Sequence, residues 1–201
     1  MRNALTMANE VRIRRVSQDD ERQRVREFFG AHIPGSTAFP LPNRQVDAAL
    51  GTPSQIWVAE DSPGDLIGAL FASNNPFDVV AWRQQGQEQV AAVIANEMAM
   101  IHELAVARHA QRSGIGSRLA RAAIDNAQAS GAAIATLIYD QRTPGLNDFY
   151  ENLGFRVLAP GELLKLHFAA LRGTPVGFPQ SDRSFRWAAM VLNSARCRIA
   201  E

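Results

Sequence analysis

The pattern of apolar and polar positions predicts alternating strands and helices from residue 11 onward. Strands are expected where apolar residues alternate with polar ones, or run uninterrupted between turn-forming residues. Helices are expected where apolar residues recur every three or four positions after a capping residue. The expected strands are 11–16, 55–60, 66–72, 98–106, 133–139, 163–168 and 185–192. The expected helices are 17–29, 44–50, 87–94, 114–130 and 143–153.

Glycine and proline residues mark the connections between these elements. Residues 30–42 contain three prolines and are expected to form a loop. A Pro-Gly pair within residues 61–65 predicts a hairpin turn between two strands, and Gly131 is expected to end the long helix in a left-handed conformation. Residues 73–96 give a weaker signal. Residues 172–181 are expected to be a loop that joins the last two strands as a hairpin.

The order of elements from residue 98 to residue 153 is strand, helix, strand, helix, which predicts a parallel strand pair. The hairpins before and after this segment should be antiparallel, so the whole sheet should be mixed and mostly antiparallel, with helices flanking it. A chain of 201 residues is long enough to bury one core. We therefore expect a single α/β (α+β) domain over residues 11–195, after a flexible tail over residues 1–10.

Composition and charge narrow the function classes. Hydrophobic residues make up 46% of the chain and charged residues 20%, which is typical of a globular protein. A net charge of +1 argues against binding of a nucleic-acid backbone through counterion release. The single cysteine, Cys197, excludes an intramolecular disulfide and fits a reducing compartment. With no signal peptide and no long apolar run, we expect a cytoplasmic protein that does not enter a membrane.

The most informative segment is 107–117, which follows a strand and opens a helix. Several N–H groups at such a junction have no partner within the helix, and the helix dipole adds partial positive charge. Gly114 and Gly116 let the backbone approach an anion, so a phosphate or pyrophosphate is the natural ligand; alternatively, the glycines only shape a tight turn. The Walker lysine is absent, because Ser117 follows Gly116, and a dinucleotide motif would need a glycine at Gln111.

The spacing Gln111-x-x-Gly114-x-Gly116, preceded by Leu-Ala-Val at 104–106, resembles the acyl-CoA signature of the GNAT superfamily of N-acetyltransferases. The segment Phe-Tyr-Glu-Asn-Leu-Gly-Phe at 149–155 is similar to a second motif of that family. The resemblance covers residues 98–158, which would form the cofactor core. It implies the mixed sheet expected above, with acetyl-CoA as co-substrate.

The resemblance also implies roles for individual residues. Main-chain groups of Leu104, Ala105 and Val106 would bind the pantetheine amides. Gln111 occupies the family's Gln/Arg position, and Tyr150 would lie near the thioester sulfur. One position departs from the family, because Thr143 stands where members often carry asparagine. The resemblance therefore does not carry a cofactor contact over to this region, but pyrophosphate binding is unaffected. The residues that would cradle the pyrophosphate through main-chain N–H groups are Arg112, Ser113, Gly114, Ile115, Gly116 and Ser117.

Acetyl transfer from a thioester to an amine needs a deprotonated amine, a stabilised oxyanion and a proton for the departing thiolate. The N–H of Val106 is the candidate oxyanion donor. Tyr150 is the candidate acid, or alternatively a packing aromatic. His102 and Glu103 are the candidate bases, beside an ordered water. Strand alternation puts these two side chains on opposite faces unless a bulge intervenes, and each has a plain alternative as a structural strand residue.

The resemblance extends to acceptor chemistry without fixing the acceptor. Arylalkylamine acetyltransferases carry histidine at the His102 position, and polyamine and aminoglycoside acetyltransferases carry carboxylates at one or both positions. We expect transfer to a primary amine of a small molecule or peptide, by direct attack in a ternary complex. The alternative is a non-catalytic acyl-CoA sensor. No metal site is expected from the histidine spacing, and both a monomer and a homodimer paired through the C-terminal hairpin fit the sequence.

Overall fold

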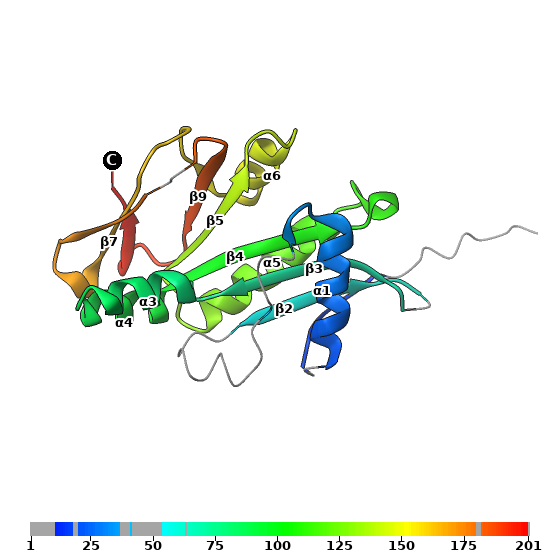
Figure 1. Ribbon diagram of the computed structural model, residues 1–201, viewed down its shortest axis with the longest axis horizontal. Coiled ribbons are helices and arrows are strands. Elements are labelled where there is room, and N and C mark those ends of the chain that lie inside the picture. The colour runs from blue at the N-terminus through cyan, green and yellow to red at the C-terminus, as the bar shows by residue number, and fades with distance from the viewer. Residues whose placement is uncertain are drawn as a thin grey trace, which may run out of the picture.

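The larger of two sheets in the computed structural model has seven strands and a mixed arrangement (Figure 1). Residues 11–17, 20–36, 41, 54–62, 64–179 and 182–200 are described. The strands, in spatial order, are β1 (Arg12–Arg15), β2 (Gln55–Glu60), β3 (Leu66–Ser73), β4 (Met98–Val106), β5 (Ile134–Asp140), β9 (Phe185–Val191) and β6 (Arg156–Val157). The β4–β5 pair is parallel and the other neighbours are antiparallel. The predicted fold class is confirmed.

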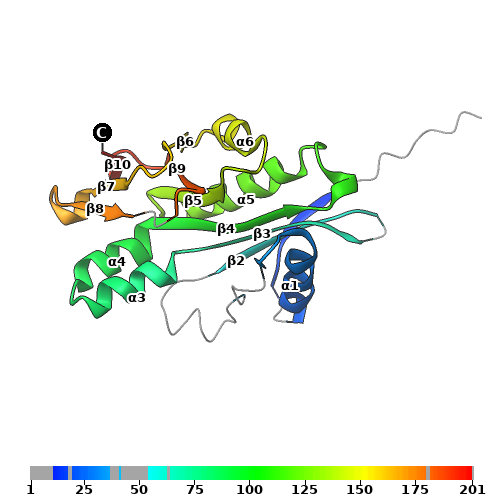
Figure 2. The ribbon, with the colours of Figure 1, turned by 45° about the horizontal axis from the view of Figure 1, so that its top comes forward.

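Helices cover this sheet on both faces, with α1 on one side and α5 on the other (Figure 2). The α-helices are α1 (Asp20–His32), α3 (Pro76–Gln84), α4 (Glu88–Glu97), α5 (Ile115–Ala129) and α6 (Leu146–Leu153). Two short 3₁₀ helices, η2 (Arg108–Ala110) and η3 (Ala169–Leu171), lie in connections. Gly131 has φ +92° directly after the C-cap of α5, as its predicted role requires.

The central core depends on a close approach between β3 and α5. Residue 68 of β3 is glycine, and a Cβ there would lie 3.0 Å from Ile115 Cγ2 and from Leu119 Cδ1, and 3.3 Å from Ala59 Cβ. Those neighbours are fully buried members of one apolar cluster. Because Gly68 has no side chain, α5 can pack closely against β3.

A second apolar core lies beside the first. A three-stranded sheet in the order β10 (Cys197–Ile199), β7 (Leu164–Phe168) and β8 (Pro175–Phe178) packs with the α3–α4 helix pair. Buried side chains of Val79, Ile94, Leu166, Phe178 and Trp187 belong to this cluster. The α3–α4 helix pair, which lies between β3 and β4 in the chain, and the small sheet, whose strands precede and follow β9, thus share one apolar core.

The predicted C-terminal hairpin is wrong, because its two strands belong to different sheets. Strand β7 pairs with β8 and β10, whereas β9 lies between β5 and β6. The expected loop 172–181 contains β8, whose buried Val176 and Phe178 give β7 a nearer partner. The run Trp187-Ala188-Ala189 in β9 is buried, which suits a central strand. A homodimer that pairs through this hairpin is therefore no longer expected.

Several helix boundaries also differ from the expectation. Helix α1 continues to His32, into the expected loop, and α3 fills the segment of weak signal. Helix α6 begins at Leu146 instead of 143, because the N–H of Thr143 donates to the carbonyl of Asp140 and closes a turn after β5. The expected strand 133–139 starts one residue later. The expected tail 1–10 and helix 44–50 lie outside the described residues. None of the described helices is long and apolar enough to cross a membrane.

We expect Gly68→Ala to lower the free energy of unfolding by about 1–3 kcal/mol, because the added methyl group overpacks the α5 interface. Urea unfolding followed by circular dichroism measures the change. Gly177→Ala is the matched control, since its Cβ would meet Leu163 at an ordinary distance of 3.4 Å. Equal losses in the two variants would contradict the close-packing argument.

Candidate active site

The parallel strands β4 and β5 stay paired for only four residues. Their register runs from Met98 opposite Ile134 to Ile101 opposite Leu137, and the strands then part (Figure 1). The N–H of Ala107 donates to the carbonyl of Ile67 at 2.9 Å, so residues 105 and 107 of this strand direct their peptide groups toward β3. The peptide groups of residues 104 and 106 consequently face the side that β5 has left. An extended ligand could pair with them as an added strand would.

A β-bulge interrupts β4 at His102. Phe71 of β3 lies opposite Glu103, and the next residue, Ala72, lies opposite Ile101, so His102 is the extra residue. Both side chains now lie on the α1 face of the sheet: His102 contacts Phe71 and Ser73, while Glu103 contacts Ser36 in the turn after α1. The bulge thus brings together two residues that strict alternation would separate.

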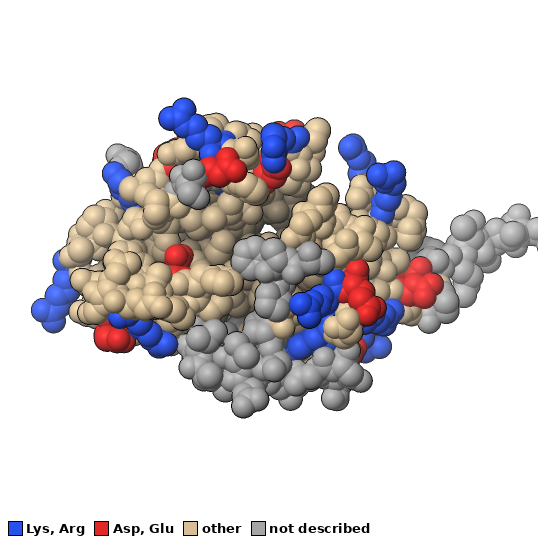
Figure 3. Space-filling model, in the orientation of Figure 1, with Lys and Arg blue, Asp and Glu red and all other residues tan. Residues whose placement is uncertain are grey.

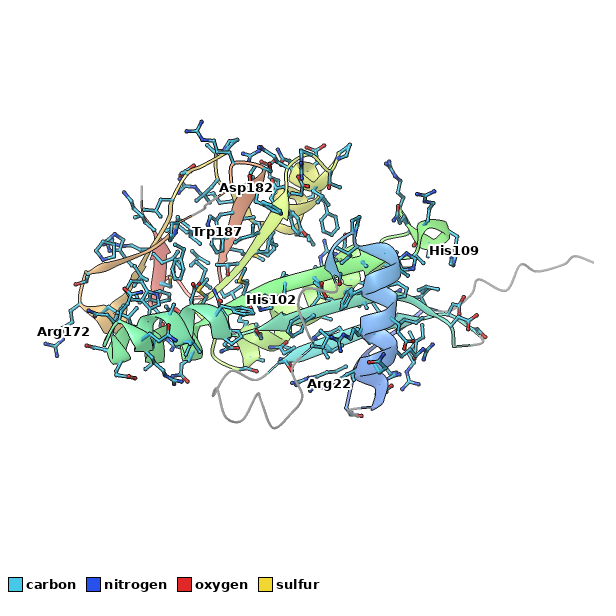
Figure 4. The ribbon with its side chains drawn as sticks, viewed as in Figure 1. Arg22, His102, His109, Arg172, Asp182 and Trp187 are labelled. Carbon is cyan, nitrogen blue, oxygen red and sulfur yellow. The ribbon has the colours of Figure 1, made fainter. Side chains whose placement is uncertain are left out.

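The His102 imidazole is held on two sides (Figure 4). Its Nε2 lies 2.7 Å from Ser73 Oγ, and its ring stacks on Phe71 with centroids 4.9 Å apart. Ser73 is only 1% exposed, so its hydroxyl is a fixed partner. Burial lowers the pKa of His102 to about 4. The ring is therefore neutral at neutral pH.

Glu103 is a buried carboxyl group with a hydroxyl partner. The side chain is 8% exposed, and Ser36 Oγ donates to its Oε1 at 2.5 Å. Burial raises its pKa, and the hydrogen bond from Ser36 offsets part of that effect. Among the described residues it has no cationic partner. A cationic group arriving at this carboxylate would therefore gain a charge-assisted hydrogen bond.

The glycine loop has the form of an anion site. Gly114 is the N-cap of α5 with φ +82°, a conformation that favours glycine, and the first helical bond runs from Arg118 N to Gly114 O at 3.0 Å. The N–H groups of residues 115–117 consequently have no acceptor within the helix. Gln111 Nε2 donates to the carbonyl of Val106 at 3.0 Å and ties the loop to the end of β4.

Both sequence motifs meet at the start of α5. A Cβ on Gly116 would lie 3.5 Å from the Phe149 ring of α6 and 3.6 Å from Val106 Cγ2 at the end of β4. The end of β4 and the start of α5, which are close in sequence, therefore meet α6 from farther along the chain beside the helix N-terminus. The residues predicted from the two motifs are adjacent in the fold, with Tyr150 next to Phe149.

Tyr150 lies in an aromatic cluster. It is 7% exposed, and its ring centroid lies 5.1 Å from Tyr139, 5.0 Å from Phe149 and 5.9 Å from Phe155. Burial, with a smaller contribution from Tyr139, raises its pKa well above the usual value. Its hydroxyl has no hydrogen-bond partner among the described residues, whereas the Tyr139 hydroxyl donates to Asn147.

Sequence reasoning missed Ser73 and Ser36. Both contact a candidate base, but each does so from another element of the fold. No local pattern signals such a pairing, because the partners are separated by 29 and 67 residues. In the described part of the chain, no three His, Cys, Asp or Glu side chains gather as metal ligands do.

Comparison with known proteins relates this chain to acetyltransferases. The family model of the acetyltransferase (GNAT) domain matches residues 52–157, just over half of the chain. No curated protein matches it.

Solved structures of the same architecture include three acetyltransferases of low sequence identity. A GNAT acetyltransferase from Staphylococcus aureus Mu50 is 15% identical, with TM-score 0.56 and coverage of 92% of this chain and 100% of that one. The ribosomal-protein-S18-alanine N-acetyltransferase of Escherichia coli is 14% identical, with TM-score 0.56 and coverage of 92% and 95%. A GNAT enzyme from Elizabethkingia anophelis with bound acetyl-CoA is 16% identical, with TM-score 0.53 and coverage of 90% and 97%.

The depressed pKa of His102 predicts a pH-dependent stability. Between the unfolded value of 6.5 and the folded value of about 4, the unfolded chain binds more protons, so the free energy of unfolding decreases as the pH falls through this window. We expect a loss of about 1–3 kcal/mol from this group. Urea unfolding between pH 7 and pH 4 measures it. His102→Gln should flatten that part of the profile, whereas an unchanged slope would contradict the assignment.

Proposed function

Since this chain belongs to the GNAT family of acetyltransferases, it is an acetyl-CoA-dependent N-acetyltransferase, and we propose that its acceptor is a primary amine that attacks directly in a ternary complex. The observation that carries this proposal is the parting of β4 and β5 beside the free N-terminus of α5. Acetyl-CoA supplies an activated acetyl thioester. A small molecule or a peptide would supply the amine.

The residues present fit the two polar parts of acetyl-CoA. Main-chain N–H groups of residues 112–117 would hold the pyrophosphate, since those of the first helical turn have no helical acceptor and Gly116 leaves no side chain above them. The peptide group of Leu104 and the N–H of Val106, with Ala105 between them, would bind the pantetheine amides, while the Val106 carbonyl accepts from Gln111. Gln111 would keep the loop in register with β4 through its bond to Val106 O.

The chain also has groups that would stabilise the oxyanion and protonate the departing thiolate. The Val106 N–H would donate to the carbonyl oxygen as it gains negative charge. Tyr150 would donate its phenolic proton to the departing thiolate, a role that its raised pKa supports because the phenol stays protonated until that step.

On the amine side, we assign different roles to the two candidate bases. Glu103 would hold the incoming ammonium, because its buried carboxyl has no cationic partner among the described residues. His102 is neutral, and its Nε2 is occupied by Ser73, which leaves Nδ1 to pass the amine proton on. Ser73 and Ser36 would act as positioning residues, each through one of these side chains.

Tyr150→Phe should lower kcat by roughly 10²–10⁴-fold, the usual contribution of a general acid, and leave CoA affinity unchanged. Release of CoA thiol with a panel of primary amines measures turnover, and calorimetry with CoA measures affinity. Tyr139→Phe is the matched control, since it removes a hydroxyl from the neighbouring ring, 5.1 Å away, and should retain most of the activity. Full activity of Tyr150→Phe would remove Tyr150 from the mechanism. Absence of turnover by the wild-type protein on every amine, with CoA bound, would overturn the proposed acceptor class.

Ser73→Ala and Ser36→Ala separate the two amine-side roles. Ser73→Ala should lower kcat about tenfold and shift the acidic limb of the kcat/KM profile, because the orientation of the imidazole is lost. Ser36→Ala should mainly raise KM for cationic amines, because Glu103 loses its fixed position. The pH profiles of both variants, beside His102→Gln and Glu103→Gln, test the assignment. Identical profiles for the two serine variants would refute the division of roles.

A further inference from the structure

The C-terminal part of the chain carries an excess of positive charge. Residues 163–201 contain six of the 21 Lys and Arg residues but only two acidic residues, Asp182 and Glu201, which gives +4 from six minus two, whereas the whole chain is +1. These residues include the whole small sheet and strand β9 of the large sheet, and they lie outside the match to the family model. The near-neutral total therefore conceals a local basic region.

Strand alternation places part of this charge on the outer face of the small sheet. Leu164, Leu166 and Phe168 of β7 are buried in the second core, so Lys165 and His167 between them face outward. Arg198 of β10 lies directly opposite His167 and is exposed. Among the described residues, Lys165, Arg172 and Arg198 form no ion pair. Figure 3 shows basic side chains at the end of the molecule where Figure 4 labels Arg172.

A depression of about 260 Å³ lies at the same place. Its lining residues are His167, Phe168, Ala169, Gly173, Ser194, Ala195, Arg196, Cys197 and Arg198. None of them is acidic. His167 Nδ1 is buried without a hydrogen-bond partner among the described residues. Arg196 is held in place by Gly131 O at 2.7 Å and by Glu97 Oε1 at 2.9 Å.

We propose that this depression binds the phosphate group of a small molecule. Arg198 would pair with two phosphate oxygens, since a guanidinium matches that geometry. The Ser194 hydroxyl would donate to a third oxygen. The charge of Arg196 is compensated by Glu97, so the positive potential at the depression comes from Arg198, Lys165 and Arg172. The concave shape and limited volume favour a small phosphorylated ligand over an extended polymer.

This site is separate from the candidate active site. Arg172, beside the depression, and His109, beside the glycine loop, lie at opposite ends of the long axis of the molecule (Figure 4). Phosphate could also bind at the N-terminus of α5, so the experiment has to report which end is occupied. The two histidines, His167 and His109, supply that report.

The test is a titration of the whole protein with inorganic phosphate at constant ionic strength, followed by NMR of the histidine side chains. The chain has four histidines, and His167→Gln assigns the signal of interest. The His167 signal should move saturably, and it should do so equally when CoA is present in excess. Arg198→Gln should weaken the affinity about tenfold, because a charge-assisted contact is lost. Arg121→Gln, on an exposed position of α5, is the matched control and should leave the affinity unchanged.

Two further arms distinguish the source of the phosphate. Tighter binding of glycerol 3-phosphate than of inorganic phosphate identifies an ester as the ligand, and the reverse identifies the free ion; both support the site. Movement of the His109 signal alone, or equal affinities in Arg198→Gln and wild type, would overturn it. Arg198-dependent binding of a single-stranded oligonucleotide more tightly than of glycerol 3-phosphate would also overturn it, in favour of a polymer.

Discussion

The short pairing of β4 and β5 is the constraint on which the candidate site depends. Two parallel strands that stayed together along their length would satisfy each other's peptide groups and leave nothing for a ligand. Here they are hydrogen-bonded at one end and apart at the other. The apolar core holds them there, because α5 packs on β2, β3 and β4 while α6 packs beside β6. The separation of the two strands is thus maintained by packing between other elements of the fold.

The bulge at His102 likewise leaves polar side chains in positions that a regular strand would not give them. One inserted residue turns two neighbouring polar groups onto the α1 face, where each finds a hydroxyl partner from another element. Burial then moves their pKa values in opposite directions, lowering that of His102 and raising that of Glu103. A local irregularity of one strand therefore affects both the position and the protonation of His102 and Glu103, the two candidate bases.

The second core shows how additional segments can be attached to such a framework. The α3–α4 helix pair and the small sheet bury their apolar faces against each other and against the paired ends of β4 and β5. The outward face of the small sheet is left to carry charge. This division places the basic depression far from the glycine loop, so the two proposed anion sites would not compete.

Local patterns in the sequence were sufficient for the elements whose signals are local. The glycine spacing in 111–116 identified the loop and helix start of α5, and apolar runs identified β2 to β5. The pairing partner of each strand could not be predicted in the same way. The sequence pattern predicted a hairpin of strands 163–168 and 185–192, but strand pairing depends on which apolar faces lie nearest to each other after the chain collapses. The same holds for Ser73 and Ser36, whose importance arises only from contact with distant residues. The amino-acid sequence by itself determined the periodicity, the turns and the glycine loop before α5, because these follow from neighbours in the chain. Only the tertiary structure decided the strand order, the bulge and the side-chain partners, because burial and long-range hydrogen bonding act between segments that the sequence keeps apart.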